Sequence, residues 1–171
     1  MANSLLADAF AHHVWATESV IDACLALDAQ QLEAPVNGVF GSIVDTARHL
    51  VGADSWYLFS ITSGSHPAVE ADHLGLEELR SVIGGDGLAW QELLAKSPDP
   101  ETVIKRRRAD GSEEHAPLGI RFAQALHHGT DHRSQICTAL TLLGVEPPDI
   151  DVWSYAWSAG TLVEIPPEAK T

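Results

Sequence analysis

Apolar residues recur every three or four positions along most of the chain, and this spacing predicts helices rather than strands. The first helix is predicted from Leu5 to Leu27, a stretch that contains neither glycine nor proline. A second helix is predicted to begin after Ser42, which stands three residues before Asp45 in the spacing of a capping box, and to run to about Thr62. Two long helices therefore occupy the first part of the chain.

The third predicted helix, from Leu76 to Leu94, contains an interruption. Gly84, Gly85 and Gly87 lie inside its apolar pattern, and a glycine in a helix costs about 1 kcal/mol relative to alanine. We therefore expect this helix to be kinked or split at the glycines.

A non-helical excursion separates the third helix from the fourth. Residues 102–108, followed by Asp110-Gly111, predict an extended arm or a short hairpin that lies outside the helices. Apolar positions then recur from Leu118 to Leu143, after Pro117, which suits a first helical turn. This stretch predicts a long fourth helix.

Beyond the fourth helix only one short element is expected. Asp149 or Asp151 can cap a short terminal helix, and residues 166–171 resemble a frayed tail. Together the segments predict an all-α protein of one domain over residues 1–171. Its architecture is a four-helix bundle with a short extended arm before the last long helix and a short C-terminal helix.

Charge and composition narrow the partners and the compartment. The chain carries 24 acidic against 10 basic residues, a formal net charge of −14, which repels nucleic acid and anionic membranes. No stretch reaches the ~18 apolar residues of a membrane helix, and the first residues lack the basic flank of a secretory signal. Cys24 and Cys137 form no C-x-x-C motif and fit a reducing compartment. We expect a cytoplasmic protein that binds neither nucleic acid nor membranes.

Histidine, with nine copies, is the residue type that stands out. His128 and His132 are four residues apart on the fourth predicted helix, so their imidazoles lie on one face, one turn apart. His49 lies midway along the second helix, at a comparable depth. A metal site and a satisfied polar stripe both explain the pair, and a lone histidine such as His49 is more often a core residue bonded to a carbonyl.

The residues around these histidines resemble a known family. The run from His128 to Ile136, continued by Leu142 to Pro148, is similar to the final-helix signature of the DinB-like metal-binding four-helix bundles. Residues 42–58, with Ala47-Arg48-His49-Leu50 at their centre, resemble the second-helix motif of that family. The resemblance implies that His49, His128 and His132 bind one divalent transition metal ion. Ser134 replaces a glycine found in many members, which leaves the ligands in place and alters the packing beside them.

Three neutral imidazoles leave at least one coordination position for water or substrate. Zinc and nickel are the expected ions, because manganese and iron more usually take a carboxylate ligand. Asp45 and Asp131 are candidates to accept a hydrogen bond from a ligand imidazole, although both also fit a solvated helix surface. His12 or His13 could add a fourth ligand, but packing already explains the apolar stripe of the first helix.

Three tryptophans are candidates for the wall of a substrate pocket. Trp56 shares a helix face with His49, and Trp153 and Trp157 could fold back as a lid. Burial in the core or in an interface is the alternative for all three. The basic run Lys105–Arg108 either pairs with acidic residues or attracts an anionic substrate or partner.

The open ligand set and the resemblance lead to three functional hypotheses. The first is a metal-dependent enzyme acting on a small molecule, because a metal can activate water or a thiol near neutral pH. Characterised DinB-like relatives include S-transferases and isomerases that use a low-molecular-weight thiol such as bacillithiol or mycothiol, so thiol transfer is the favoured reaction. The second is a metal-dependent hydrolase. The third is a non-catalytic, metal-stabilised bundle that acts as a dimeric interaction module in a stress response; a homodimer is expected.

Overall fold

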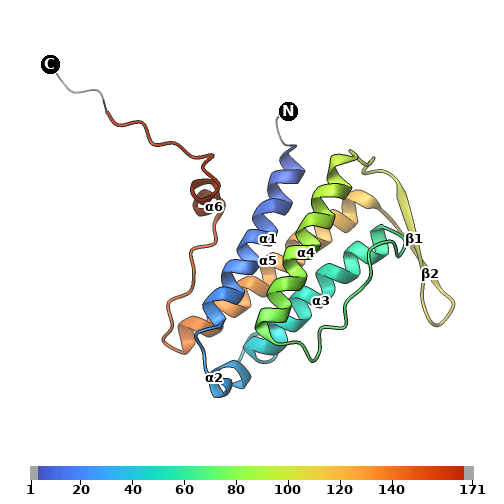
Figure 1. Ribbon diagram of the computed structural model, residues 1–171. Coiled ribbons are helices and arrows are strands. Elements are labelled where there is room, and N and C mark those ends of the chain that lie inside the picture. The colour runs from blue at the N-terminus through green and yellow to red at the C-terminus, as the bar shows by residue number, and fades with distance from the viewer. Residues whose placement is uncertain (1–3, 168–171) are drawn as a thin grey trace.

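Helices make up most of the computed structural model, which describes residues 4–167, and one hairpin interrupts them (Figure 1). In chain order the elements are α1 (Leu5–Cys24), α2 (Ala29–Glu33), α3 (Ile43–Ile61), α4 (Leu76–Ala95), β1 (Val103–Arg107), β2 (Glu113–Pro117), α5 (Leu118–Leu142) and α6 (Val152–Ser158). The predicted helical bundle, the arm before its last long helix and the short C-terminal helix are confirmed. Helix α2 is an addition that the apolar pattern did not predict, and α1 ends at Cys24 rather than at Leu27.

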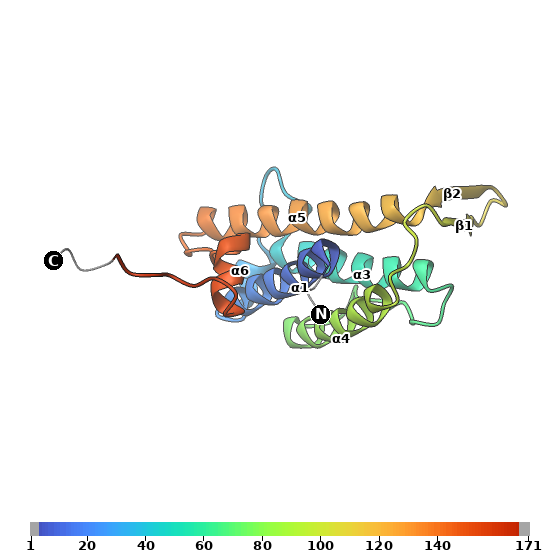
Figure 2. The ribbon, with the colours of Figure 1, turned by 90° about the horizontal axis from the view of Figure 1, so that it is seen from above.

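Helices α1, α3, α4 and α5 pack as a four-helix bundle in which α1 and α3 each contact both α4 and α5. After α3 the chain runs back along that helix: the Arg48 Nε–H donates to the carbonyl of Leu74 (3.0 Å), and the Val69 N–H donates to Ser55 Oγ (2.9 Å). Helix α4 therefore starts at the same end of the bundle as α3 (Figure 1). Figure 2 shows the hairpin beyond one end of the bundle and the C-terminal segment leading away from the other.

Helix α3, which carries His49, begins at a capping box. Ser42 Oγ accepts from the Asp45 N–H (3.2 Å), and Asp45 Oδ2 accepts from the Ser42 N–H (3.4 Å). These bonds satisfy donors that the first turn of a helix leaves unpaired. The predicted start of this helix is confirmed, and it fixes where His49 falls along α3.

The third helix was predicted to be kinked or split at the glycines; the split is wrong, because α4 is one continuous helix from Leu76 to Ala95. Helix α4 packs against α1. A Cβ at Gly87 would lie 2.9 Å from Cγ1 of Val14, which is too close for a side chain. Glycine lets the two helices approach, and the packing that this allows offsets its conformational cost.

The predicted arm is a two-stranded antiparallel hairpin formed by β1 and β2. Its register places Arg106 opposite Glu114 and Arg107 opposite Glu113. The guanidinium of Arg108 also pairs with Glu114, at 2.7 Å. Acidic residues of the hairpin itself therefore face the basic run.

A polar layer divides the core of the bundle into two apolar halves. One half includes Ile21, Leu50 and Ile136, and the other includes Phe10 and Trp90. Between them each long helix contributes buried polar side chains: His13 and Thr17 from α1, Asp54 from α3, Asp86 from α4, and Arg133 from α5.

Asp54 is the centre of this polar layer. Its two carboxylate oxygens accept from the Nε2–H of His13 and from the Nε1–H of Trp90, each at 2.9 Å. Arg133 Nη1–H donates to the other ring nitrogen of His13, also at 2.9 Å. A His13 ring that accepts on one nitrogen and donates on the other is neutral, so it bridges a carboxylate and a guanidinium. A Cβ at Gly129 would lie 2.6 Å from Nδ1 of His13, so this bridge requires glycine on α5.

The remaining predictions concern the membrane and the C-terminus. None of the helices within residues 4–167 is long and apolar enough to cross a membrane. Asp151 Oδ1 accepts from the Ser154 N–H (2.7 Å) and caps α6, so one of the two candidate capping residues is confirmed. Most of the frayed tail predicted at residues 166–171 lies outside the described residues.

Candidate metal centre

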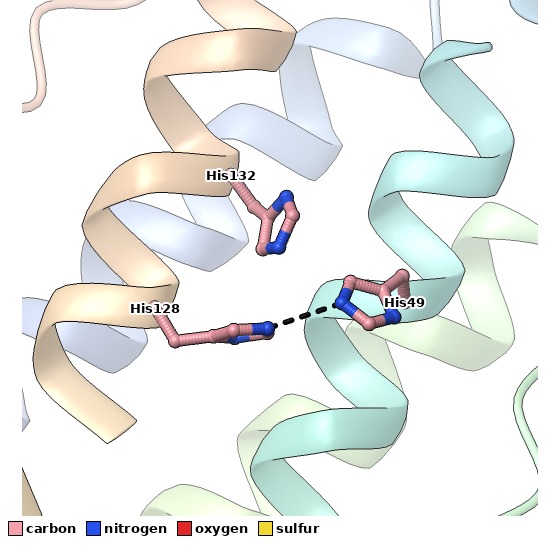
Figure 3. A group of neighbouring side chains, drawn as sticks. All are labelled: His49, His128 and His132. Atoms are coloured by element: carbon pink, nitrogen blue, oxygen red, sulfur yellow. Dashed lines mark hydrogen bonds between the residues drawn. The ribbon is translucent and has the colours of Figure 1, made fainter. Parts of the chain in front are cut away.

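Three histidine side chains from two helices point toward one another in the bundle (Figure 3). Helix α3 supplies His49, helix α5 supplies His128 and His132, and one ring nitrogen of each lies within 4.8 Å of the others. Nε2 of His49 and Nε2 of His128 are 3.1 Å apart. The structure thus brings together the three residues that the sequence and the family resemblance singled out.

Helices α3 and α5, which carry the cluster, run antiparallel to each other. His128 and His132 are one turn apart on α5, with ring centroids 4.4 Å apart. One turn before His128, the Gln124 Nε2–H donates to the hydroxyl of Tyr57 at 3.1 Å. Since Tyr57 comes after His49 while Gln124 comes before His128, the two helices run antiparallel past the cluster.

Gln135 orients one of the three rings. Its Oε1 accepts from Nδ1–H of His132 at 2.9 Å and from the backbone N–H of Phe40 at 3.2 Å. A proton held on Nδ1 leaves Nε2 of His132 with a free lone pair, which is the form that binds metal. Sequence reasoning did not assign this role, although the spacing of three residues after His132 on a helix was a readable signal.

Aromatic side chains surround the cluster. The ring of Phe40 stacks on His49 with centroids 4.1 Å apart and meets His132 edge-on at 5.5 Å. Tyr57 meets His128 edge-on at 5.7 Å. Such apolar surfaces restrict water around the ligands and limit rotation of their rings.

Burial favours the neutral form of His49 and His128. Desolvation lowers the pKa of His49, and the nearby His132 lowers it further. Desolvation also lowers the pKa of His128 to about 4, with further contributions from His132 and His49. Only a neutral imidazole carries the lone pair that a metal needs, so at neutral pH these side chains are in the ligand form.

The donor set fits a divalent transition metal. Around a tetrahedral zinc ion with Zn–N bonds of ~2.05 Å, neighbouring nitrogens lie about 3.3 Å apart. The separation of 3.1 Å between Nε2 of His49 and Nε2 of His128 is close to that value. Imidazole nitrogen suits zinc, nickel and copper, and three such ligands leave a position of a four-coordinate ion for water or substrate. The three histidines can therefore hold one such ion.

Within the described residues, neither Asp45 nor Asp131 hydrogen-bonds to a ligand histidine, contrary to the expectation from the sequence. Asp45 is committed to the start of α3, where its carboxylate accepts from Ser42 Oγ at 2.7 Å. Asp131 is exposed on α5 and acts on His128 only through space, by favouring its protonated form. Gln135, rather than either aspartate, accepts a hydrogen bond from a ligand histidine.

A cavity of about 780 Å³ lies beside the cluster and is lined by His49 and His128. Trp56 and Tyr57 form part of its wall. The guanidinium of Arg106 sits 4.4 Å from the centre of the Trp56 ring, which is a cation–π contact. One residue of the hairpin therefore reaches the wall of the cavity.

The prediction that Trp153 and Trp157 form a lid over this cavity is wrong. Helix α6 packs against α1, where the ring of Tyr155 lies 5.5 Å from that of Trp15. Trp153 and Trp157 are 70% and 59% exposed, and neither lines the cavity beside His49. The segment after α5 turns toward α1 rather than toward α3, which no local sequence signal indicates.

Neither His12 nor His13 supplies a fourth ligand. The His12 Nε2–H donates to the carbonyl of Ile150 at 2.8 Å and so fastens the segment before α6 to α1. His13 is bound on both ring nitrogens, by Asp54 and by Arg133.

Comparison with known proteins adds one positive finding. The model of the DinB family matches residues 1–169, nearly the whole chain. No curated protein matches the chain. The match covers both helices that carry the histidines as well as the rest of the bundle. The chain therefore belongs to the DinB family.

Proposed function

We propose that the protein is a metal-dependent enzyme acting on small molecules. The observation that carries this proposal is that two of the three histidines of the cluster, His49 and His128, line a cavity of about 780 Å³. A metal held by these side chains would lie beside space for a substrate. A purely structural metal site would be closed by a fourth protein ligand.

Zinc or nickel is the proposed ion, for the reason that the cluster offers imidazole nitrogen and no carboxylate. When bound, such an ion lowers the pKa of a water molecule or a thiol, so that either becomes a nucleophile near neutral pH. The protein supplies the neutral rings, the orientation of His132 by Gln135, and the aromatic walls Trp56 and Tyr57.

Transfer of a low-molecular-weight thiol is the proposed reaction, and a metal-dependent hydrolase is the second candidate. The family resemblance favours the thiol, and the open cavity supports both. The third candidate, a non-catalytic interaction module, requires a metal without an exchangeable position. A homodimer is proposed for each case, with exposed apolar side chains of the C-terminal region, such as Trp153, Trp157 and Ile165, as available surface.

Metal content is the first test. The purified protein should contain close to one equivalent of zinc or nickel, and His128→Ala/His132→Ala should contain none while keeping the circular dichroism of a helical protein. His127→Ala is the matched control, because His127 is the exposed neighbour on the same helix. Absence of metal after reconstitution of the wild type with either ion would overturn the proposal.

Activity distinguishes the candidates. The metal-loaded protein is incubated with 1-chloro-2,4-dinitrobenzene and cysteine, glutathione or bacillithiol, and in parallel with p-nitrophenyl acetate without thiol. Thiol-dependent product that His128→Ala abolishes supports a transferase, and thiol-independent ester cleavage with the same dependence supports a hydrolase. If the protein loaded with paramagnetic Ni²⁺ or Co²⁺ shows no exchangeable water in water-proton relaxation measurements, both enzyme candidates are contradicted.

The compartment and the excluded partner are also proposals. The free thiols Cys24 and Cys137 agree with a reducing cytoplasm. The net charge of −14 opposes binding to nucleic acid. Salt-dependent binding to duplex DNA near physiological ionic strength would contradict this expectation.

A further inference from the structure

A second cavity, of about 810 Å³, lies between α1, α5 and α6, apart from the histidine cluster. Most of its wall is apolar and includes Leu5 and Ala9 of α1, Leu126 of α5, and Val152 and Ala156 of α6. None of the three clustered histidines lines it. Its volume falls within the range of about 300–1,000 Å³ that is usual for small-molecule sites.

Arg133 gives this apolar cavity a buried positive charge. It contributes to the lining although only 3% of the residue is exposed. Its Nη1–H groups bond to His13 and to Thr17 Oγ (3.1 Å), and Nη2–H donates to Thr130 Oγ (3.2 Å). Within residues 4–167 no hydrogen bond uses its Nε, and no carboxylate forms an ion pair with it.

The charge of Arg133 is therefore only partly compensated. The carboxylate of Asp54 reaches it through the neutral ring of His13 rather than directly. A guanidinium is charged at neutral pH, and burial places this one in surroundings that disfavour charge. A buried cation in this state is stabilised by an anion that enters the cavity beside it.

We propose that this cavity binds a small apolar molecule with a single carboxylate, which pairs with Arg133 while the apolar body packs against α6. A guanidinium matches the planar geometry of a carboxylate better than that of other anions. Inorganic phosphate would leave most of the apolar wall uncovered, and a neutral apolar molecule would leave Arg133 without an anion. Asp8, which also lines the cavity, disfavours a second negative group on the ligand.

Calorimetry with a chain-matched pair of probes tests the proposal. Octanoate and 1-octanol have the same carbon chain and differ in charge. The full chain, with metal removed by chelation, should bind octanoate with a stoichiometry of one and bind 1-octanol about tenfold to a hundredfold more weakly, as expected for a charge-assisted hydrogen bond. Inorganic phosphate should give no saturable heat. Equal affinity for the two eight-carbon probes, or no binding of octanoate, would overturn the proposal.

The metal centre needs a separate control, because a carboxylate can also ligate a metal. His49→Ala/His128→Ala should bind octanoate as the wild type does, with metal present or absent. Loss of octanoate binding in this variant would place the carboxylate at the histidine cluster and overturn the proposal. The outcome is independent of whether the protein is an enzyme.

Two further variants locate the ligand. Ala156→Phe fills the cavity from α6 and should abolish octanoate binding, whereas Ser158→Phe adds the same bulk on α6 at an exposed position outside the lining and should not. Arg133→Met should remove the preference for octanoate over 1-octanol. If Arg133→Met does not fold, the wild-type preference and Ala156→Phe still decide. Octanoate binding that is unchanged in Ala156→Phe overturns the proposal. This holds whether or not the mass of the protein in solution changes, which would indicate contact with a second copy.

Discussion

At the scale of single residues, Gln135 does for His132 what a carboxylate does for the ligand histidine of many metal sites. The amide oxygen accepts from the imidazole Nδ1–H and from the backbone of Phe40, so it connects the ring to the segment that precedes α3. A neutral acceptor achieves this without adding negative charge next to the metal position.

Replacing Gln135 should therefore weaken metal binding without removing a ligand. Gln135→Met keeps the length of the side chain, loses the acceptor, and is expected to lower the affinity for zinc about tenfold to a hundredfold. Competition with a chromophoric chelator measures this affinity. Gln124→Met is a matched change on the same helix, α5. It removes a bond to Tyr57 of α3 and should change the affinity for zinc little. Equal affinities of Gln135→Met and the wild type would contradict a role for this contact.

Gly129 should be indispensable for a reason unrelated to helix propensity. A Cβ at this position would lie 2.6 Å from Nδ1 of His13, inside the bridge between Asp54 and Arg133. Gly129→Ala should lower the free energy of unfolding by about 2–4 kcal/mol, because it disrupts a buried network. Urea denaturation measures the loss. Gly85→Ala, where nothing lies within 4 Å, should instead stabilise the protein by up to about 1 kcal/mol.

Part of the metal centre was accessible from the sequence because it depends on helix periodicity. The spacing of His128 and His132 places both on one face of a helix whatever surrounds it. Phe40 was not accessible, because it stacks on His49 only through the path of the turn before α3. The role of Asp54 was not accessible either, because only the packed bundle shows that it is the centre of the buried polar layer.

At the scale of elements, local signals predicted where helices begin and packing decided what the sequence left ambiguous. Ser42 and Asp45 set the start of α3 as expected. Helix α4 is continuous despite its glycines, and the close contact of Gly87 with α1 offsets part of their conformational cost. That contact cannot be read from α4 alone. The position of α6 against α1 likewise depends on a residue distant in sequence, because His12 of α1 bonds to the carbonyl of Ile150 just before α6.

The cap of α3 should have a measurable effect on stability. Ser42→Ala removes the acceptor of the Asp45 N–H and is expected to lower the free energy of unfolding by about 1 kcal/mol. The urea midpoint reports this change. Asp28→Ala removes the equivalent cap of the short helix α2, which buries no residue, and should cost less. An unchanged urea midpoint in Ser42→Ala would show that the cap is not needed to hold α3.

At the scale of the whole molecule, the polar layer makes stability depend on pH. Asp86 is buried, its Oδ2 has no hydrogen-bond partner among the described residues, and its Oδ1 accepts from the Nε2–H of His66 at 2.8 Å. Burial, with the nearby charge of Asp54, raises the pKa of Asp86 from 3.8 to about 7. The folded protein therefore binds this proton more tightly than the unfolded chain, and the resulting stability is lost as the pH rises from about 4 to about 7.

Asp86→Asn should remove this dependence. Asparagine keeps an acceptor for His66 and carries no charge, so the variant should be more stable than the wild type at about pH 8, by on the order of 2 kcal/mol, with the difference shrinking toward about pH 4. Thermal unfolding followed by circular dichroism at a series of pH values measures the difference. Asp72→Asn, an exposed loop position, serves as the control. A stability difference that does not vary with pH would contradict the ionisation of buried Asp86.

The hairpin has a consequence for how molecules behave in concentrated solution. A two-stranded sheet leaves the outer backbone groups of both strands unpaired, and such edges can join to those of neighbouring molecules. Here the strands carry opposite charges in register, basic on β1 and acidic on β2. Burying either edge against another strand would remove these charges from water, so the same side chains that neutralise each other within the hairpin discourage the protein from aggregating through it.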